Sequence, residues 1–338
     1  MAVIDPGRLP NKPFKPKTRR DLGLAAVLGL TLGVGLALLL EHLDDSIKSL
    51  DDLERACNLP SLGVLPLLGS NGRITLRLGG KSKASGGRRY PPRLQRAGQT
   101  AADAADLDLM VYKHPQAQIS EAIGHIYSSI MLSASGRPPC AIMVTSPNPS
   151  EGKSMVVSNL AQSYALNDRQ VVLIDCDLRK PRLHKVYQLH NQPGLSNYLT
   201  GNATLEEILR DTSIPNLTII TGGSRPPSPA NLLNSEIFKE LLAQLRQQFR
   251  HIIIDTPPVL GFADARFVSA LVDGVLLVTR CHSTHKSAGR LAHHLLGQAP
   301  LLGAVLNSVD AHGRGYGNYY YYSNHYKYYS KYYGEKES

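Results

Sequence analysis

The chain has 338 residues and a formal net charge of +10 at pH 7, a length that suffices for one large domain or two modest ones. Much of the excess positive charge lies in two short stretches, residues 8–20 and 73–96, which is unlike the continuous basic face of a nucleic-acid-binding domain. The four cysteines show no CxxC pairing, so we expect reduced thiols in a cytosolic compartment and not a disulfide framework.

The N-terminal forty residues contain the one membrane signal of the sequence. Residues 1–20 are a lead-in rich in proline and lysine, which favours an extended chain. Residues 21–40 are nearly all Leu, Ala, Val and Gly, and such a run is long enough to span a bilayer as a helix. A signal peptide is the alternative. The lead-in is long and no small-residue cleavage site follows, so a transmembrane helix is predicted.

The next two segments are expected to lie outside the main domain. Residues 41–68 form a juxtamembrane segment, with a short amphipathic stretch at 44–58 and a possible strand at 62–68. Residues 69–117 are rich in Gly, Ser and Arg with little apolar content, so they are predicted to be a disordered linker.

Residues 118–312 have the pattern of an α/β domain. Ile119, Ile123, Ile126 and Ile130 recur at helical spacing. The predicted strands are 140–145, 171–175, 217–221, 251–255, 275–279 and 304–306, and the clearest helices between them are 154–166, 235–249 and 284–296. Strands that are apolar throughout and alternate with helices indicate a parallel sheet with helices on both faces. Residues 313–338 lack such a pattern and are predicted to be a disordered, tyrosine-rich tail.

A phosphate-binding loop follows the first strand of this domain. The sequence Ser146-Pro-Asn-Pro-Ser-Glu-Gly-Lys-Ser154 has the strand–loop–helix context of a Walker A motif, in which backbone N–H groups and a helix N-terminus face the phosphates. Lys153 would reach the β- and γ-phosphates of ATP, and the Ser154 hydroxyl would hold Mg²⁺. The motif alone is weak, because Pro147 replaces its first glycine and Ser150 stands where glycine is common. The expected ATP-binding residues are Pro149, Ser150, Glu151, Gly152, Lys153, Ser154 and Met155.

Two further strands end in aspartates. The strand 171–175 ends at Asp175, with Asp177 two residues later, and the strand 251–255 ends at Asp255. A single aspartate at a strand end is often only a helix cap or a loop residue. Ligands of an open parallel sheet bind at the carboxyl ends of its strands, so these aspartates and Lys153 are expected to converge on one P-loop NTPase-like site.

The chain resembles the bacterial tyrosine kinases (BY-kinases), the cytoplasmic kinase part of the polysaccharide co-polymerases and chain-length determinant proteins. Besides the loop and the aspartates, the resemblance rests on further motifs: Leu62-Gly-Val-Leu-Pro66, Arg179-Lys180-Pro181, Gly194-Leu-Ser-Asn-Tyr-Leu, Pro227-Ser-Pro-Ala-Asn-Leu-Leu233 and Leu302-Gly-Ala-Val-Leu-Asn307. It implies a P-loop fold related to the septum-site and partitioning ATPases. The implied activity is tyrosine autophosphorylation that regulates exopolysaccharide or capsule synthesis and export.

The same resemblance implies a role for each polar residue of the site. Lys153 and Ser154 would bind the phosphates and Mg²⁺, and Asp177 and Asp255 would organise the metal. Asp175 would accept the tyrosine proton as the phosphoryl group moves. This agrees with the general chemistry, since phosphoryl transfer needs charge neutralisation, alignment and a carboxylate near the attacking hydroxyl.

The tail would supply the phosphate acceptors. Ten of the sixteen tyrosines of the chain lie there: Tyr316, Tyr319, Tyr320, Tyr321, Tyr322, Tyr326, Tyr328, Tyr329, Tyr332 and Tyr333. There are two alternative interpretations: a sticky disordered tail, and a surface on which the bases of a nucleic acid stack. Both are less favoured in a chain that also has an ATP site. Each phosphate would add about −1.5 to −2 charges, which would make the tail strongly acidic.

The resemblance also implies partners. They are the tail of a neighbouring subunit in a homo-oligomer, an export partner in the membrane that carries the chain-length-determinant domain, and a tyrosine phosphatase; no nucleic acid is expected. The family's helix before the first strand usually carries a glutamate and two arginines that link subunits into a ring. Here Glu121 is present, but Gly124 and Tyr127 occupy the arginine positions, so ring formation stays open.

Two alternatives to a kinase remain. One is an ATPase of the septum-site and partitioning type, which usually has a signature lysine where this chain has Asn148. The other is a catalytically weak, nucleotide-binding regulator.

The basic residues before the span would place everything after it outside the cell. Because the domain uses ATP, we expect the opposite: a single pass through the bacterial inner membrane with the kinase domain in the cytoplasm.

Overall fold

The computed structural model describes residues 18–67, 107–133, 138–167 and 170–310. The chain divides into two compact units, Met1–Asp45 and Ser46–Ser338. The predicted lead-in up to residue 17, the part of the predicted linker from residue 69 to residue 106, and the tyrosine-rich tail from residue 313 lie outside the described residues.

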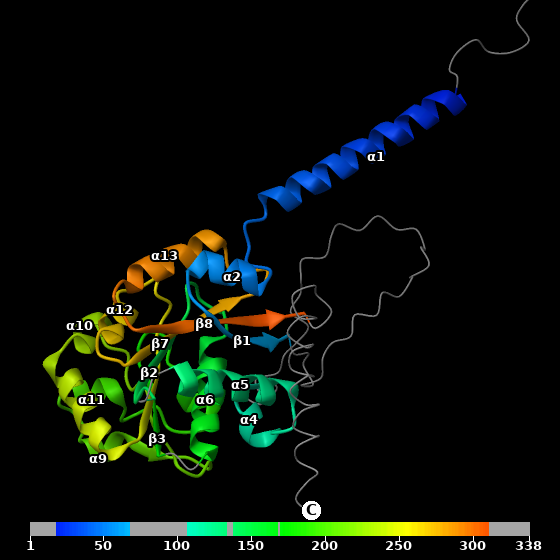
Figure 1. Ribbon diagram of the computed structural model, residues 1–338. Helices are drawn as coiled ribbons and strands as arrows, with labels where there is room; N and C mark the ends of the chain where they lie inside the picture. Colours follow the sequence, from blue (N-terminus) through cyan, green and yellow to red (C-terminus); the bar gives the residue numbers. More distant parts are fainter. Residues whose placement is uncertain (1–17, 68–106, 134–137, 168–169, 311–338) are drawn as a thin grey trace, which may run out of the picture. The chain divides into compact units, whose positions relative to one another are not determined.

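The described part of the first unit is one long helix, α1, Thr18–Leu43 (Figure 1). Its part from Asp21 to Leu43 is long and apolar enough to cross a membrane. At 1.5 Å per residue its 26 residues extend over about 39 Å, more than the roughly 30 Å of a hydrocarbon core. Apolar side chains such as Leu28 and Leu36 are exposed along it, as expected of a helix that faces lipid.

The second unit is built on an eight-stranded sheet in the order β1-β8-β7-β2-β6-β3-β5-β4, counted over the described residues. The strands are β1 Ser61–Pro66, β2 Ala141–Thr145, β3 Val171–Asp175, β4 Leu209–Asp211, β5 Leu217–Ile220, β6 His251–Asp255, β7 Gly274–Arg280 and β8 Leu301–Val309. Neighbouring strands run parallel except β4 and β5, which are antiparallel. The predicted parallel sheet is therefore confirmed, with β4 as an unpredicted addition at its end.

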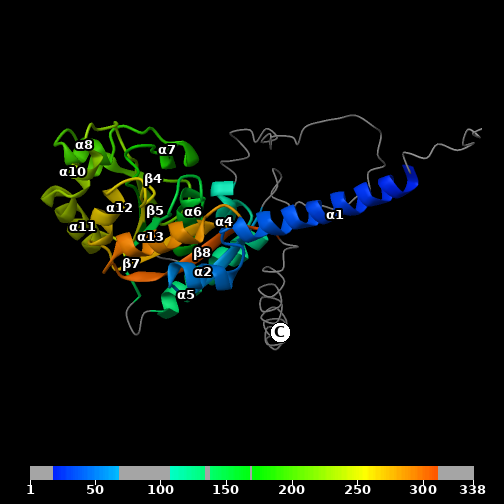
Figure 2. The ribbon, with the colours of Figure 1, turned by 90° about the horizontal axis from the view of Figure 1, so that it is seen from above.

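Helices cover both faces of this sheet (Figure 2). They are α2 Leu50–Cys57, α4 Met110–Lys113, α5 Gln118–Ser133, α6 Lys153–Leu166, α7 Leu183–Val186, α8 Leu195–Leu199, α9 Leu205–Ile208, α10 Pro229–Leu233, α11 Glu236–Gln248, α12 Asp264–Ser269 and α13 Lys286–Leu296. Successive residues of a strand point to opposite faces. On β2, Met143 packs into the core under α2, α11 and α13, whereas Ile142 and Val144 pack under α5 and α6.

Residues 46–67 belong to this fold, although the sequence placed them in a separate juxtamembrane segment. β1 pairs in parallel with β8, with Ser61 beside Ala304 and Val64 beside Leu306. α2 packs against α13, and Ile47, Leu53 and Leu65 are completely buried. The domain begins at Ser46 and not at residue 118, because these apolar side chains complete both cores.

The predicted disordered linker 69–117 is also too long. Residues 107–117 are part of the fold, held by two side-chain amides of α6. Asn159 Oδ1 accepts from the Val111 N–H at 3.0 Å, and Gln162 Oε1 accepts from the Tyr112 N–H at 3.0 Å. The amide groups of the same two side chains donate to the carbonyls of Leu107 and Asp108. Polar partners on α6, which composition does not reveal, order this segment.

Candidate active site

Three neighbouring strands deliver the predicted site residues to one edge of the sheet. β6 lies between β2 and β3, and the register places Asp255 beside Val144 on one side and beside Asp175 on the other. All three strands run in the same direction, so their carboxyl ends meet. The structure therefore brings Asp175, Asp177 and Asp255 next to the loop between β2 and α6, as the sequence predicts.

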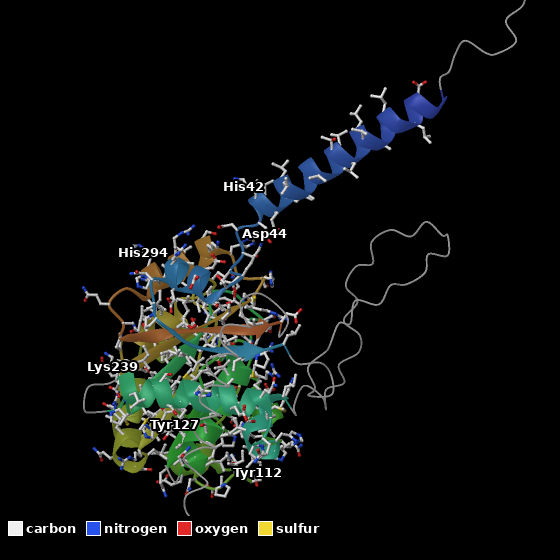
Figure 3. All side chains as sticks on the ribbon, turned by 45° about the vertical axis from the view of Figure 1, so that its right-hand side comes forward. His42, Asp44, Tyr112, Tyr127, Lys239 and His294 are labelled. Atoms are coloured by element: carbon white, nitrogen blue, oxygen red, sulfur yellow. The ribbon has the colours of Figure 1, made fainter. Side chains whose placement is uncertain are left out.

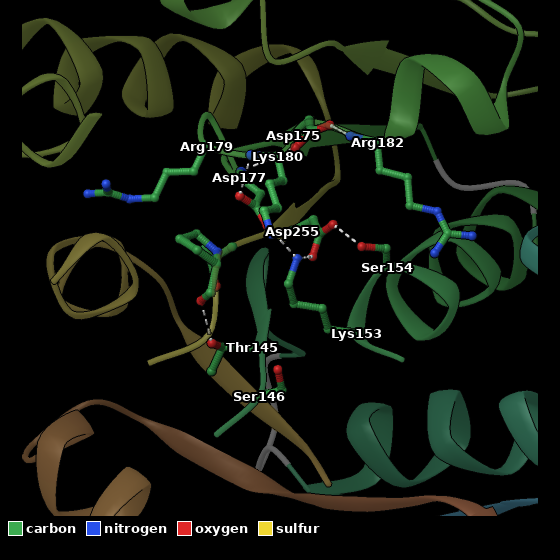
Figure 4. A network of polar contacts seen from close by, with 12 residues as sticks. Thr145, Ser146, Lys153, Ser154, Asp175, Asp177, Arg179, Lys180, Arg182 and Asp255 are labelled. Atoms are coloured by element: carbon green, nitrogen blue, oxygen red, sulfur yellow. Dashed lines mark hydrogen bonds and ion pairs between the residues drawn. The ribbon is translucent and has the colours of Figure 1, made fainter. Parts of the chain in front are cut away.

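Lys153 is the centre of the polar contacts at this edge (Figure 4). Its Nζ lies 3.0 Å from Oδ2 of Asp177 and 3.1 Å from Oδ1 of Asp255. Only 11% of the Lys153 side chain and 1% of the Asp255 side chain are exposed. The Ser154 hydroxyl donates to Oδ2 of Asp255 at 2.7 Å. One cation and one hydroxyl thus join the P-loop to both acidic loops.

Burial and charge act against each other on these groups. Burial alone would lower the pKa of Lys153, but the charges of Asp255 and Asp177 outweigh it and raise that pKa. Burial raises the pKa of Asp255, and the Lys153 charge and the Ser154 hydrogen bond offset this only in part. Lys153 is therefore firmly protonated and lies among more negative charge than it can neutralise. An additional cation would be favoured in such surroundings.

Asp175 is the most tightly held of the three aspartates. It is completely buried, and its carboxylate accepts three backbone N–H groups. Oδ1 accepts from Asp177 at 3.1 Å, while Oδ2 accepts from Arg182 at 2.9 Å and from Leu183 at 3.0 Å. Burial and then the charge of Asp255 raise the pKa of Asp175 to about 7. A carboxyl group with such a pKa exchanges protons readily at neutral pH.

The P-loop uses left-handed backbone at two residues. Gly152 has φ +97°, and a Cβ there would fall 2.0 Å from Nδ2 of Asn307, so no other residue type fits. Ser150 has φ 66°, the conformation that glycine favours and that a serine adopts at some cost. The serine that weakens the motif in the sequence therefore does occupy a glycine-like position. Pro149 and Ser150 are exposed, while Glu151 is buried.

A cavity of about 240 Å³ lies beside the start of α6, and Met155 lines it. Arg182, Arg280, Asn307 and Asp108 contribute further to its walls. Asp108 is buried and forms an ion pair with Arg182. Asn307 is the last residue of the motif Leu302-Gly-Ala-Val-Leu-Asn307, and Arg182 directly follows Arg179-Lys180-Pro181. Asp108 gave no signal at all, because it lies in a segment that resembles a linker.

The oxygen ligands at this edge are of the kind that Mg²⁺ takes. Across the described residues, no group of three or more His, Cys, Asp and Glu side chains lies close enough to hold a metal ion by itself. Mg²⁺ usually takes one or two carboxylates, with water and substrate phosphates completing its shell. The Ser154 hydroxyl together with Asp177 and Asp255 fits that pattern.

Helix α5 carries Glu121, Gly124 and Tyr127, which occupy the positions of the family's glutamate and two arginines. Figure 3 labels one of them, Tyr127. Its ring meets the ring of Tyr164 on α6 edge-on, with centroids 4.7 Å apart, and Tyr164 is fully buried. Tyr127 therefore helps to pack α5 against α6 within one chain, a role that an arginine would not fill.

Comparisons with known proteins agree with this architecture. A family model described as an AAA domain matches residues 142–294. The chain is 34% identical to the tyrosine-protein kinase YwqD of Bacillus subtilis over 202 residues, which are 59% of this chain and 85% of the relative. It is 31% identical over 318 residues to the tyrosine-protein kinase Ptk of Acinetobacter johnsonii. The kinase domain of the Escherichia coli tyrosine kinase Etk matches with a TM-score of 0.64 and 27% identity, covering 78% of this chain and 95% of that domain.

The parallel sheet, the P-loop and the two aspartate loops define a P-loop nucleotide-binding domain. The sequence relatives narrow this class further. The chain belongs to the bacterial tyrosine kinase family. The match with the Acinetobacter kinase covers 94% of this chain but only 40% of that relative.

Proposed function

We propose that this chain is an ATP-dependent protein tyrosine kinase that phosphorylates its own C-terminal tyrosine cluster. The observation that carries the proposal is the convergence of Lys153, Asp177 and Asp255 at the carboxyl edge of the sheet. In a member of this family, such a site in the same chain as a segment with ten tyrosines would supply both an enzyme and its substrate. The proposed acceptors are Tyr316, Tyr319, Tyr320, Tyr321, Tyr322, Tyr326, Tyr328, Tyr329, Tyr332 and Tyr333.

Residues 149–155 would bind ATP. The backbone of the loop and the Lys153 ammonium group would neutralise the β- and γ-phosphates. The nucleoside would occupy the cavity lined by Met155 and Asn307, which adjoins the loop. Lys153 already lies between two carboxylates, so a triphosphate would compete with Asp177 and Asp255 for the same ammonium group.

Mg²⁺ would be held by Ser154, Asp177 and Asp255, and would supply charge neutralisation of the phosphates when bound. The three side chains offer one hydroxyl and two carboxylates at one edge of the sheet. The carboxylates lie in a part of the domain where negative charge exceeds positive charge. Both properties support the assignment.

Asp175 would act as the general base. As the tyrosine oxygen forms its bond to the γ-phosphorus, the bond from that phosphorus to the β–γ bridging oxygen breaks and ADP leaves. The phenolic proton would pass to Asp175. Its three backbone hydrogen bonds hold the carboxylate in one orientation, and Oδ1, which accepts only the Asp177 N–H, retains lone-pair capacity for a proton. Burial and the charge of Asp255 raise its pKa above the ordinary range of a carboxyl group, which favours its taking up a proton.

The setting of this reaction is proposed from the resemblance to chain-length determinant proteins. The kinase would be anchored by α1 in the bacterial inner membrane with its domain in the cytoplasm, where ATP is present. It would phosphorylate the tail of a neighbouring copy and work with an export partner in the membrane. A tyrosine phosphatase would reverse this phosphorylation. Its output would be control of exopolysaccharide or capsule synthesis.

One experiment separates this function from its alternatives. The purified protein is incubated with ATP and Mg²⁺ and probed for phosphotyrosine, beside Lys153→Met and a shortened form that ends at Asp310. We expect phosphotyrosine in the intact protein alone. ATP hydrolysis without phosphotyrosine would instead identify an ATPase of the partitioning type, and binding without turnover would identify a regulator. Phosphotyrosine that survives Lys153→Met would show that the site is elsewhere.

A further inference from the structure

Phe262 is an exposed aromatic residue on the loop between β6 and α12. Its ring packs against the Arg179 guanidinium, whose Cζ lies 4.1 Å from the ring centroid. The arginine is fixed there, because its Nε donates to Asp264 Oδ2 at 2.8 Å and its Nη2 donates to Asp264 Oδ1 at 2.9 Å. Asp264 is completely buried, so this two-armed contact holds the guanidinium plane in one orientation. Phe262 itself is 40% exposed, and its ring therefore has a fixed place and an open surface.

The loop of this phenylalanine is tied to the candidate active site at both ends. Near its start, the Val259 N–H donates to the Ser146 carbonyl at 2.9 Å, where the P-loop begins. At its end, Asp264 holds Arg179, which follows Asp177 by two residues. Asp177 in turn lies 3.0 Å from the ammonium group of the P-loop lysine. The aromatic ring is therefore fixed at the rim of the site.

The stacked pair borders the side of the site away from the nucleoside cavity. Figure 4 shows the side chains of Arg179 and Arg182 extending from the aspartates in opposite directions. Arg182 lines the cavity assigned to the nucleoside. In phosphoryl transfer the attacking and leaving oxygens are roughly in line, so the acceptor must approach from the side opposite to the departing ADP. Arg179, with Phe262 against it, borders the approach that remains.

We propose that Phe262, held in place by Arg179, binds the ring of the acceptor tyrosine. An acceptor ring would pack offset or edge-on against the open surface of Phe262, with its hydroxyl directed toward Asp175 and the γ-phosphate. Serine and threonine have no ring to make this contact, so the contact would favour tyrosine as the acceptor. The occupants are the tyrosines of residues 316–333, each of which presents the same ring. The inference rests on the proposed function and adds to it a residue that recognises the acceptor.

The first test measures how the full-length protein uses an acceptor peptide with the sequence of residues 316–333. A contact between two aromatic rings accounts for about a fivefold change in an equilibrium constant. For Phe262→Leu we therefore expect the KM for the peptide to rise about fivefold. The kcat and the Kd of a fluorescent ATP analogue should change by less than about twofold. Phe262→Trp, which keeps an aromatic face, should restore the KM.

Tyr112→Leu is the matched control. Tyr112 on α4 is 41% exposed, and its hydroxyl donates to the Ser213 carbonyl next to the amino end of β5, at the opposite edge of the sheet from the aspartates. This variant should keep the wild-type KM for the peptide. Unchanged KM in Phe262→Leu, or an equal rise in Tyr112→Leu, would overturn the proposal. So would a weaker affinity of Phe262→Leu for ATP, because it would place the ring against the nucleotide.

The second test uses a peptide that cannot be phosphorylated, in which phenylalanine replaces every tyrosine of residues 316–333. It should inhibit phosphotyrosine formation on the tail of the wild type, and its inhibition constant should be about fivefold higher for Phe262→Leu. A peptide with leucine at these positions should inhibit neither protein. Equal inhibition of both proteins by the phenylalanine peptide, or no inhibition of the wild type, would contradict the proposal.

The role of Arg179 is tested by Arg179→Lys, which keeps the charge but loses the two-armed contact with Asp264. It should raise the same inhibition constant by a similar factor and add less than about twofold when combined with Phe262→Leu, because both changes remove one surface. Independent, multiplying effects would show that Arg179 does not hold the ring. If the wild type forms no phosphotyrosine at all, the proposed function itself fails. That result is distinct from a wild type that phosphorylates its tail and a Phe262→Leu that does so with an unchanged KM.

Discussion

The Ser154 hydroxyl donates its hydrogen bond to Asp255, at 2.7 Å, across the gap between the P-loop and the end of β6. Asp255 is almost completely buried, so this contact is shielded from bulk water. Since the proton is engaged by the carboxylate, the lone pairs of the Ser154 oxygen remain open to a cation. In the proposed magnesium site, this pair would therefore supply part of the ligand shell, and phosphate and water would complete it.

Lys153→Met should abolish both nucleotide binding and phosphotyrosine formation. The change removes the ammonium group that would neutralise the phosphates and leaves Asp177 and Asp255 facing each other without a cation. Breaking a buried ion pair costs about 3–5 kcal/mol of stability, and we expect an ATP affinity at least about a hundredfold lower. Titration calorimetry and an anti-phosphotyrosine blot measure the two effects.

The control for this change is Lys239→Met. Lys239, labelled in Figure 3, is on α11 and pairs with Glu236 at 2.6 Å in a largely exposed i,i+3 contact. Such surface pairs contribute well under about 1 kcal/mol, so binding and phosphorylation should be unchanged. Equal losses in both variants would mean that removing any lysine is damaging.

Asp175→Asn should separate catalysis from binding. An amide cannot accept the tyrosine proton, so kcat should fall by about 10²–10⁴-fold, while the Kd for ATP stays within about threefold. The amide also accepts fewer of the three backbone N–H groups, which should cost about 1–3 kcal/mol in a urea unfolding experiment. A variant that keeps wild-type kcat would remove Asp175 from the mechanism. Equal loss of nucleotide binding would reassign it to the ATP site.

Gly152→Ala should damage the P-loop far more than its single added carbon suggests. The new Cβ would meet the Asn307 amide at 2.0 Å, and the residue would have to keep φ +97°. We expect ATP binding to be lost, as measured by equilibrium titration with a fluorescent analogue. Gly124→Ala on α5 is the matched control, since nothing lies within 4 Å of its Cβ. It should be neutral or stabilise the helix by up to about 1 kcal/mol.

Asp108→Asn should change how stability depends on pH. Burial, opposed by the charge of Arg182, raises the pKa of Asp108 from its ordinary 3.8 to about 6. The folded protein thus binds this proton more readily than the unfolded chain does. The stability that the proton contributes is complete below about pH 4 and is lost as the pH rises through about 6, which amounts to about 3 kcal/mol.

Urea unfolding of both proteins between pH 4 and pH 7 tests this sign. The wild type should lose stability relative to Asp108→Asn as the pH rises, and Asp211→Asn, which alters an exposed carboxylate on β4, should follow the wild type. A difference that runs in the opposite direction would mean that Arg182 dominates over burial.

The sheet and the central acidic residues were predictable because their signals are local. Val171–Asp175 and His251–Asp255 are entirely buried strands, and a run of four mostly apolar residues before an aspartate reveals both the strand and its end. The topology of a parallel sheet then requires the aspartates to meet. The P-loop lysine and serine follow from the same reasoning.

What could not be predicted depends on contacts between distant segments. β1 is a strand of the sheet only because β8, some 240 positions later, lies beside it. Asp108 is buried because Asn159 and Gln162 of α6 hold the backbone around it, and these amides look like ordinary helix residues in the sequence. The contact of Glu151 with Thr284 also joins two loops that no local pattern relates.

The pairing of β1 with β8 has a consequence for how the protein can be divided. β8 is a nine-residue strand, Leu301–Val309, made mostly of apolar residues. A shortened form that starts at Gln118, where the sequence pattern suggests a domain begins, would leave a row of N–H and C=O groups on β8 unpaired. Such a row is a template for a strand from another molecule. Association of such fragments would then reflect a missing strand and say nothing about how intact copies assemble.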